Sequence, residues 1–404
     1  MSDNFSCSFC NKSSEEVGKL ISGPDKIFIC DECIDVCNEV LRQDLKVSQS
    51  NSDKKITPET IHEFLNQYVI GQENAKIALS VSVYNHYKRI NSLKDNDIEL
   101  EKSNICVIGN SGSGKTLLAQ TIARFLDVPF AISDATSLTE TGYIGDDVES
   151  IIGRLYTASG QNLEKTQKGI VFIDEIDKLK RTNSPSGGRD VSGEGVQQGL
   201  LKLLEGSEIS VPVHANKKVP SAETIKINTK NILFICGGAF SEIDKIVDNI
   251  NDNPKIGFGV SKPISVIKNI EPEHLVKFGM IPELVGRLPI ITTLDDLTES
   301  QLVQILVEPK NAIIKQYKKI FKMDGVNLDF DADALIEIAK QAKLKKTGAR
   351  GLRGILEKML MNVQYKLPSL SNDGINRVVI TKSCVISGSD PIYKKKRLKK
   401  QVSN

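Results

Sequence analysis

The sequence lacks an excess of charge of one sign. Its 53 Lys and Arg residues nearly balance its 51 Asp and Glu residues, and the formal net charge at pH 7 is +2. A chain so balanced has no overall field that would favour nucleic acid or a membrane surface as its partner. It also lacks any apolar run near the roughly 20 residues that a membrane-spanning helix needs. Residues 1–7 hold neither a basic nor an apolar stretch, so we expect no secretory signal and a cytoplasmic location.

Histidine is also scarce. The chain has four histidines, His62, His86, His214 and His274, and none lies in a recognisable nucleophile motif. We therefore expect that the chain itself cleaves no peptide bonds. Its 404 residues, 40% of them hydrophobic and 26% charged, have the composition of an ordinary globular protein with two or three domains.

Cysteine, in contrast, is concentrated at one end. Cys7-x2-Cys10 and Cys30-x2-Cys33 form two Cys-x-x-Cys pairs, a spacing typical of a four-thiolate zinc site. So short a segment buries little apolar surface, so the metal would supply folding free energy. Four thiolates leave no open coordination position, which indicates a structural rather than a catalytic Zn²⁺. The alternative is a redox pair or a set of unrelated thiols. Cys37 falls outside the pattern.

The middle of the chain contains a complete phosphate-binding loop, Gly-x4-Gly-Lys-Thr. It follows an apolar run at 105–108 and opens a helical pattern, the context in which this motif binds nucleotides. We expect Lys115 to reach the β- and γ-phosphates, Thr116 to hold Mg²⁺, and the backbone N–H of Leu117 to lie near the α-phosphate. The loop residues are Gly109, Asn110, Ser111, Gly112, Ser113, Gly114, Lys115 and Thr116.

A pair of carboxylates, Asp174-Glu175, ends another apolar run at 170–173. At the end of a strand beside a phosphate loop, we expect Asp174 to support Mg²⁺ and Glu175 to orient or deprotonate the attacking water. Glu175 indicates that ATP is hydrolysed and not merely bound. The alternative interpretation is a solvated acidic loop after a strand.

The order of these features predicts several domains. Residues 1–46 form the cysteine-rich head and 47–56 a polar linker. Over 57–294, helical patterns alternate with apolar runs at 105–108, 170–173 and 232–235, which predicts an α/β domain with a parallel sheet. A smaller, mainly helical domain spans 295–387, with Thr298 as the N-cap of its first helix. Residues 388–404 form a basic tail.

Further motifs appear in order along the chain. They are Tyr68-Val69-Ile70-Gly71-Gln72, Gly142-Tyr143-Ile144-Gly145, Phe172 to Lys178, Arg189 to Gln198, Ile256-Gly257-Phe258, Ile281 to Pro289 and Lys346 to Arg353. With the phosphate loop and the cysteine head, they make the sequence resemble the ClpX family of AAA+ unfoldases, which feed the ClpP peptidase. The resemblance extends from the head to about Ser369.

The resemblance implies the fold and the activity. The fold would be an AAA+ P-loop ATPase domain with a parallel sheet, a smaller helical C-terminal domain and the N-terminal zinc-binding domain. The chain would be an ATPase whose hydrolysis drives unfolding of tagged proteins and their translocation into ClpP. Its cofactors would be ATP, Mg²⁺ and Zn²⁺. Its partners would be five further copies in a homohexamer, ClpP, unfolded or tagged substrates and adaptors, without a membrane or nucleic acid.

The resemblance also implies roles around the nucleotide. Val69 and Ile70 would pack against the adenine ring. Arg287 would be the arginine finger that reaches the γ-phosphate held by a neighbouring subunit. Arg350, in the small domain, would be the sensor-2 arginine, which contacts the phosphates and couples the nucleotide to the angle between the domains.

Three further segments would contact proteins. Tyr143 and Ile144 would form the first pore loop, and Arg189 would belong to the second. Ile256, Gly257 and Phe258 would dock in pockets of ClpP, with avidity from several loops. One departure concerns the pore entrance, where the family usually has Arg-Lys-His and this chain has Asn216-Lys217-Lys218-Val219. The preference for particular substrate tails is therefore open.

Three alternatives remain from the sequence. The first is an AAA+ remodeller of protein or nucleic-acid complexes that acts without a peptidase. The second is a helicase or loader whose zinc head and basic tail contact phosphates, which the balanced charge and the aromatic Tyr143 disfavour. The third is a scaffold that does not hydrolyse ATP, which Lys115, Glu175 and Arg287 disfavour.

Overall fold

A computed structural model describes most of the chain in two compact units, Met1–Ile56 and Thr57–Asn404. The described residues are 6–14, 16–24, 27–37, 56–91, 98, 100–139, 146–181, 193–212, 224–251, 270–345 and 347–395. The expected pore residues Tyr143, Ile144 and Arg189 and the expected docking residues 256–258 lie outside them. None of the helices in these ranges is both long and apolar enough to cross a membrane.

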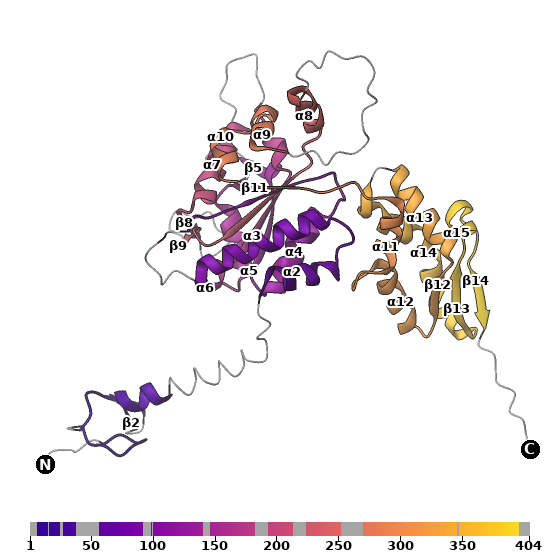
Figure 1. The fold of residues 1–404 in the computed structure, drawn as a ribbon. Coiled ribbons are helices and arrows are strands. Elements are labelled where there is room, and N and C mark those ends of the chain that lie inside the picture. Colours follow the sequence, from indigo (N-terminus) through magenta and orange to yellow (C-terminus); the bar gives the residue numbers. More distant parts are fainter. Residues whose placement is uncertain are drawn as a thin grey trace, which may run out of the picture. The chain divides into compact units, whose positions relative to one another are not determined.

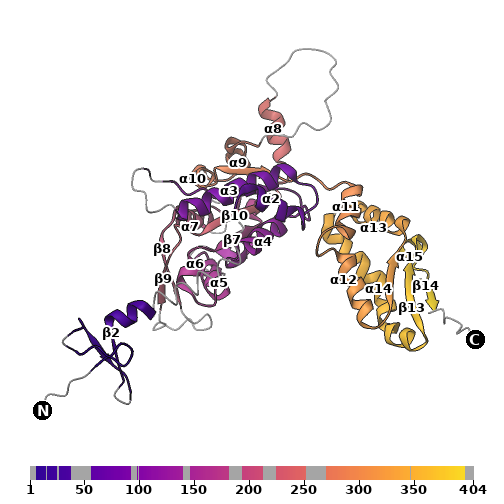
Figure 2. The same ribbon diagram turned by 60° about the horizontal axis from the view of Figure 1, so that its bottom comes forward.

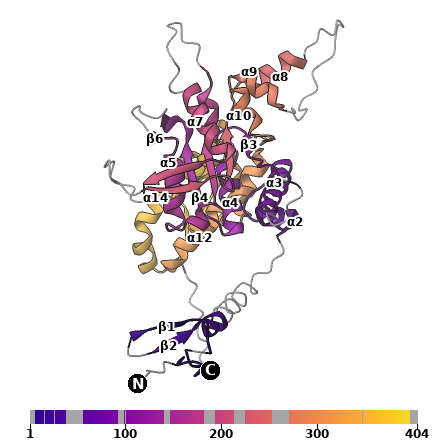
Figure 3. The ribbon, with the colours of Figure 1, turned by 90° about the vertical axis from the view of Figure 1, so that its left-hand side faces the viewer.

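The first unit is built around a small hairpin. Strands β1 (Leu20–Ser22) and β2 (Phe28–Cys30) pair antiparallel, and residues 31–37 continue from β2 as a helix. Figure 3 shows the hairpin beside this helix. The hairpin ends at Cys30 and the helix carries Cys33, so the second cysteine pair spans a strand-to-helix junction.

The second unit contains a five-stranded parallel sheet in the order β11-β3-β10-β7-β4. Figure 1 shows strands crossing the middle of this domain, among its helices. The three apolar runs expected to be strands are confirmed, and they form the centre of the sheet as β3, β7 and β10. The strands are β3 (Ile105–Ile108), β4 (Phe130–Asp134), β7 (Ile170–Asp174), β10 (Leu233–Gly238) and β11 (Ile290–Thr293). Every residue of β3 and β10 is buried, as expected for strands covered on both faces.

Successive residues of the central strands enter two different cores. Ile105 and Val107 pack with α2 (Pro58–Asn66), α3 (Glu73–Asn91) and α4 (Lys115–Leu126). Cys106 and Ile108 pack on the opposite face with α5 (Ser150–Ala158), α7 (Glu194–Glu205) and α10 (Pro282–Gly286). Figure 2 shows α2, α4 and α7 around the strands β7 and β10. The sheet is therefore a middle layer whose strand ends are available for a site. The remaining elements of this domain are η2 (Ala135–Ser137), β5 (Leu138–Thr139), β6 (Asp146–Asp147), α6 (Leu163–Thr166), η3 (Ile176–Leu179), β8 (Glu208–Pro212), β9 (Thr224–Asn228), α8 (Ile243–Asn251) and α9 (Pro272–Phe278).

The residues after β11 form a second lobe with its own core. Its elements are α11 (Glu299–Val307), α12 (Ile313–Met323), β12 (Asn327–Phe330), α13 (Ala332–Leu344), α14 (Gly348–Asn372), β13 (Ile375–Ile380), α15 (Lys382–Ser387) and β14 (Ile392–Lys395). The first four helices pack beside the three-stranded sheet β12-β13-β14 (Figure 1). Thr298 is confirmed as the N-cap of α11, where it forms a capping box with Gln301.

The lobe continues into the segment that the sequence predicts to be a basic tail. β14 lies within residues 388–404 and pairs antiparallel with β13. Tyr393 of β14 packs against the lobe's core. This apolar contact holds β14 in place, although the next two residues of the strand are lysines. The described structure thus includes β14 up to Lys395, and residues 396–404 lie outside the described residues.

Candidate functional site

The phosphate loop lies between β3 and the start of α4. Gly112 has φ +80° and Gly114 has φ +110°, so both occupy the left-handed region that glycine tolerates best. Gly114 is the N-cap of α4 and Lys115 is its first residue. The loop thereby presents the first backbone N–H groups of a helix, which is a favourable environment for phosphate oxygens.

Lys115 folds back over the loop. Its Nζ donates hydrogen bonds to the carbonyl oxygens of Gly109 at 2.6 Å and Asn110 at 3.3 Å. The residue is 8% exposed, and burial lowers the pKa of its ammonium group despite the opposing effect of Asp174. An anion in the loop would favour the charged form of Lys115, so the side chain fits a phosphate ligand.

Asp174, at the end of β7, lies across from the start of α4. Its Oδ2 accepts a hydrogen bond from the Thr116 hydroxyl at 3.3 Å, and its Oδ1 accepts one from the Glu175 backbone N–H at 3.0 Å. Glu175 is exposed and has φ +57°, an unusual backbone for a non-glycine residue. The structure thus places a hydroxyl and a carboxylate together, as a Mg²⁺ site requires, with a second carboxylate beside them.

The end of β10 lies between β3, which leads into the phosphate loop, and β7, which ends at Asp174. A Cβ atom on Gly237 would lie 2.6 Å from the Phe172 ring, and one on Gly238 would lie 2.8 Å from Asp177 Oδ1. The same Asp177 Oδ1 accepts a hydrogen bond from the Ala239 N–H at 3.1 Å. Only glycine therefore lets the end of β10 lie this close to Phe172 of β7 and to Asp177 of η3.

The small lobe touches the phosphate loop directly. Arg350 Nη1 donates to the Ser111 hydroxyl at 3.3 Å, and the Ala349 N–H donates to the Gly112 carbonyl oxygen at 3.2 Å. Both residues lie in the first turn of α14. The expected sensor-2 arginine is thus next to the loop in which phosphates would bind.

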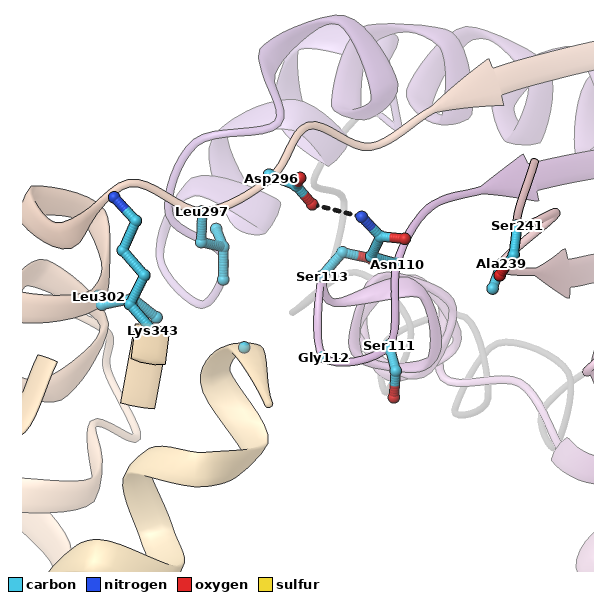
Figure 4. A pocket seen from close by; sticks show the side chains of 11 residues that line it. Asn110, Ser111, Gly112, Ser113, Ala239, Ser241, Asp296, Leu297, Leu302 and Lys343 are labelled. Atoms are coloured by element: carbon cyan, nitrogen blue, oxygen red, sulfur yellow. Dashed lines mark hydrogen bonds between the residues drawn. The ribbon is translucent and has the colours of Figure 1, made fainter. Parts of the chain in front are cut away.

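A cavity of about 590 Å³ opens beside the loop. Figure 4 shows Asn110 and Asp296 at its edge, joined by a 2.7 Å hydrogen bond from Asn110 Nδ2 to Asp296 Oδ1. The cavity is lined by Asn110, Ser111, Gly112, Ser113, Ala239, Ser241, Asp296, Leu297, Leu302, Lys343 and Gly348. Its size and its mixture of polar and apolar walls suit a nucleotide.

The two residues expected to contact adenine are not in this lining. Val69 is 5% exposed and belongs to the core around α2 and α3, whereas Ile70 is partly buried. Their segment is bonded to the connection between the lobes. The Gln72 amide accepts from the Asp295 N–H and donates to the Asp295 carbonyl oxygen, both at 2.8 Å.

Arg287, the expected arginine finger, is the C-cap of α10 and is bonded to Glu205. Its Nε and Nη2 donate to Glu205 Oε1 at 3.2 and 3.0 Å. It is not among the residues that line the cavity of the same chain.

The four cysteines of the head form one cluster. Their Sγ atoms all lie within 4.8 Å of one another, with 3.9 Å between Cys7 and Cys33 and 3.6 Å between Cys10 and Cys30. Tetrahedral thiolates around Zn²⁺ are about 3.8 Å apart, given Zn–S bonds near 2.3 Å, so the cluster fits the metal. Burial acts to raise the pKa of Cys7, but backbone N–H groups of Cys10, Phe9 and Cys30 outweigh it and lower that pKa to about 6.

Sequence reasoning missed the parts of the cavity that come from other segments. Ala239 and Ser241 follow β10, and a strand end beside the phosphate loop was a usable signal for them. Asp296 and Leu297 follow β11, the edge strand that the apolar runs did not reveal. Lys343 lies in a helix of the other lobe, and no local pattern indicates it.

Comparison with known proteins gives three family matches along the chain. They are the ClpX C4-type zinc finger over residues 6–43, the AAA domain of the Cdc48 subfamily over 100–291, and the C-terminal, D2-small domain of ClpB protein over 297–373. The first spans all four clustered cysteines and confirms the zinc head, and the second confirms the AAA+ fold. The ATP-dependent Clp protease ATP-binding subunit ClpX of Treponema denticola is 48% identical over 393 residues, which cover 95% of this chain and 94% of that protein. The chain therefore belongs to the ClpX family.

Proposed function

We propose that the chain is an ATP-driven protein unfoldase and translocase that passes its substrates to the ClpP peptidase. The observation that carries this proposal is the bonding of the small lobe to the phosphate loop through Arg350 and Ala349. A change at the loop must alter these bonds, so the nucleotide state is coupled to the position of a whole lobe. Such coupling is what a motor needs in order to turn hydrolysis into movement.

Each residue near the loop has a role consistent with its contacts. Lys115 holds the β- and γ-phosphates, while Thr116 and Asp174 hold Mg²⁺. Glu175 orients the attacking water and accepts its proton. When bound, ATP supplies the phosphoryl group and Mg²⁺ neutralises its charge. Cys7, Cys10, Cys30 and Cys33 hold a structural Zn²⁺ in the head.

Arg287 acts on a neighbouring copy. It lies away from the cavity of its own chain, and an arginine that stabilises transferred phosphoryl charge must reach the γ-phosphate. A homohexameric ring supplies that geometry, because every copy then contributes one arginine and receives one. Tyr143, Ile144 and Arg189 grip the substrate in the central pore, and residues 256–258 dock on ClpP. The protein acts in the cytoplasm.

The first test follows a stably folded fluorescent protein with an unstructured terminal tag. This fluorescent substrate is mixed with the chain, ATP and a chaperonin capture mutant that prevents refolding, without any peptidase. We expect fluorescence to fall with ATP and to persist with a non-hydrolysable analogue. Persisting fluorescence during active ATP hydrolysis, with several tags tried, would refute the unfoldase activity.

A second test separates the peptidase partnership from unfolding. Deleting Ile256–Phe258 should abolish degradation of the tagged protein by added ClpP and leave ATP hydrolysis and unfolding intact. Unimpaired degradation would exclude this segment as the docking site.

A further inference from the structure

The contact between Arg287 and Glu205 is more specific than an ordinary surface ion pair. Arg287 Nε and Nη2 both donate to the same oxygen, Glu205 Oε1, at 3.2 and 3.0 Å. These two donors lie on one edge of the planar guanidinium group. The two side chains are 53% and 44% exposed, and the shared oxygen defines the orientation of the guanidinium plane as well as its position.

A single buried side chain holds the backbone of Arg287 and the backbone of Leu204, the residue before Glu205. Asn104, which is 1% exposed, donates from Nδ2 to the Leu204 carbonyl oxygen at 3.2 Å and to the Arg287 carbonyl oxygen at 3.0 Å. Gly206 follows with φ +101°, and a Cβ there would lie 2.9 Å from Lys230 Cα. The end of α7 is thus fixed at Glu205, its last residue. The backbone on both sides of the Glu205–Arg287 pair is therefore already in place when the two side chains meet.

The same helix is held near its other end. The Gln197 side chain is fully buried, donates to the Leu179 carbonyl oxygen at 2.6 Å and accepts from the Ile281 N–H at 2.8 Å. Leu179 ends η3, which follows Glu175, and Ile281 is the N-cap of α10. Helix α7 therefore joins the catalytic side of its own site to the short helix that presents Arg287.

We propose that Glu205 is a positioning residue that orients Arg287 toward the γ-phosphate of the neighbouring copy. Glu205 occupies the Nε–Nη2 edge, so the Nη1 hydrogens and the second Nη2 hydrogen remain directed away from it. Those donors can form bidentate hydrogen bonds with phosphate oxygens. The inference rests on the proposed role of Arg287 as the arginine finger. It assigns to α7, through Glu205, the role of orienting that arginine.

The test measures steady-state ATP hydrolysis by the assembled full-length chain. Four variants are compared with the unchanged protein: Glu205→Ala, Glu205→Gln, Arg287→Ala, and the double variant of Glu205→Ala with Arg287→Ala. The control is Glu208→Ala, which removes a nearby carboxylate whose Lys226 partner is 3.9 Å away and 75% exposed. Assembly and thermal stability are checked for each variant by sedimentation and thermal melting.

We expect Glu205→Ala to lower kcat about tenfold with KM for ATP changed less than about twofold, as for a misplaced catalytic group. Glu205→Gln keeps an acceptor oxygen and should remain within about threefold of the unchanged kcat. In the Arg287→Ala background, Glu205→Ala should cause no further loss, because its effect passes through the arginine. The Glu208→Ala variant should hydrolyse ATP normally.

Several outcomes would overturn the proposal. One is an unchanged or higher kcat for Glu205→Ala, and another is a kcat for Glu205→Gln as low as that for Glu205→Ala. A third is that Glu205→Ala lowers kcat in the Arg287→Ala background by the same factor as in the unchanged protein, which would reveal a purely structural role. An unchanged kcat for Arg287→Ala itself would instead refute the arginine finger. The two failures are therefore distinguishable.

Discussion

His86 should make the stability of the ATPase domain depend on pH. It lies in α3, is 4% exposed, and its Nε2 is 3.0 Å from the Asn231 carbonyl oxygen, so Nε2 carries the hydrogen. Burial, reinforced by the charges of Arg89 and Lys102, lowers the pKa of His86 from 6.5 to about 3. The folded protein therefore keeps this imidazole neutral at pH values where the unfolded chain protonates it.

The size of the effect follows from proton linkage. Because the pKa is lower in the folded state, stability is complete above pH 6.5 and is lost as the pH falls toward 3. Between pH 7 and pH 5 the unfolded state gains about 2 kcal/mol from this one group, taking 1.36 kcal/mol per unit below the unfolded pKa. The result is insensitive to the folded pKa, since any value well below 5 gives the same difference.

The measurement compares His86→Gln with the unchanged chain in urea at pH 7, 6 and 5. The variant retains a neutral donor for Asn231, and the other titrating groups, including Lys102, are common to both proteins. We expect the unchanged chain to lose about 2 kcal/mol more than the variant between pH 7 and pH 5, seen as a larger drop in the urea midpoint. Parallel pH profiles for the two proteins would refute the burial argument.

Three other changes have definite outcomes. Glu175→Gln should retain ATP binding and lower kcat at least about 100-fold, since a general base is lost; hydrolysis at the unchanged rate, with binding followed by a fluorescent analogue, would contradict its role. Cys10→Ser should unfold the head, whereas Cys37→Ser, outside the cluster, should not, as followed by nuclear magnetic resonance spectra. A folded head in both variants would argue against the metal. Gly112→Ala would place a Cβ 2.6 Å from the Thr347 carbonyl oxygen at φ +80°, so ATP affinity should fall at least about tenfold, while Gly354→Ala, with open space at its Cβ, serves as the control.

The parts of the fold that could be predicted are those whose signal is local. The apolar runs now seen as β3, β7 and β10 are buried on both faces, and such strands are continuous in sequence. The edge strands β4 and β11 were not predicted, because a strand at the side of a sheet needs fewer apolar residues. β14 was hidden for a related reason, since three of its four residues are polar or aromatic and its partner strand supplies the hydrogen bonds.

The candidate site likewise has parts that local sequence patterns predict and parts that they do not. The phosphate loop and the cysteine pairs have fixed spacings because backbone geometry and tetrahedral coordination impose them. The bond between Asn110 and Asp296 joins residues 186 positions apart, and that between Arg287 and Glu205 joins residues 82 apart. Such contacts depend on how packed elements meet, and no local periodicity records them.

The left-handed backbone at Glu175 has a consequence for engineering. A non-glycine residue held at φ +57° stores strain of about 1–3 kcal/mol. Asparagine and glycine tolerate this conformation better, so replacing Glu175 with either would relieve the strain and remove the carboxylate at once. Selection for heat resistance alone would therefore favour inactive variants at this position, and a useful screen must reward turnover and stability together.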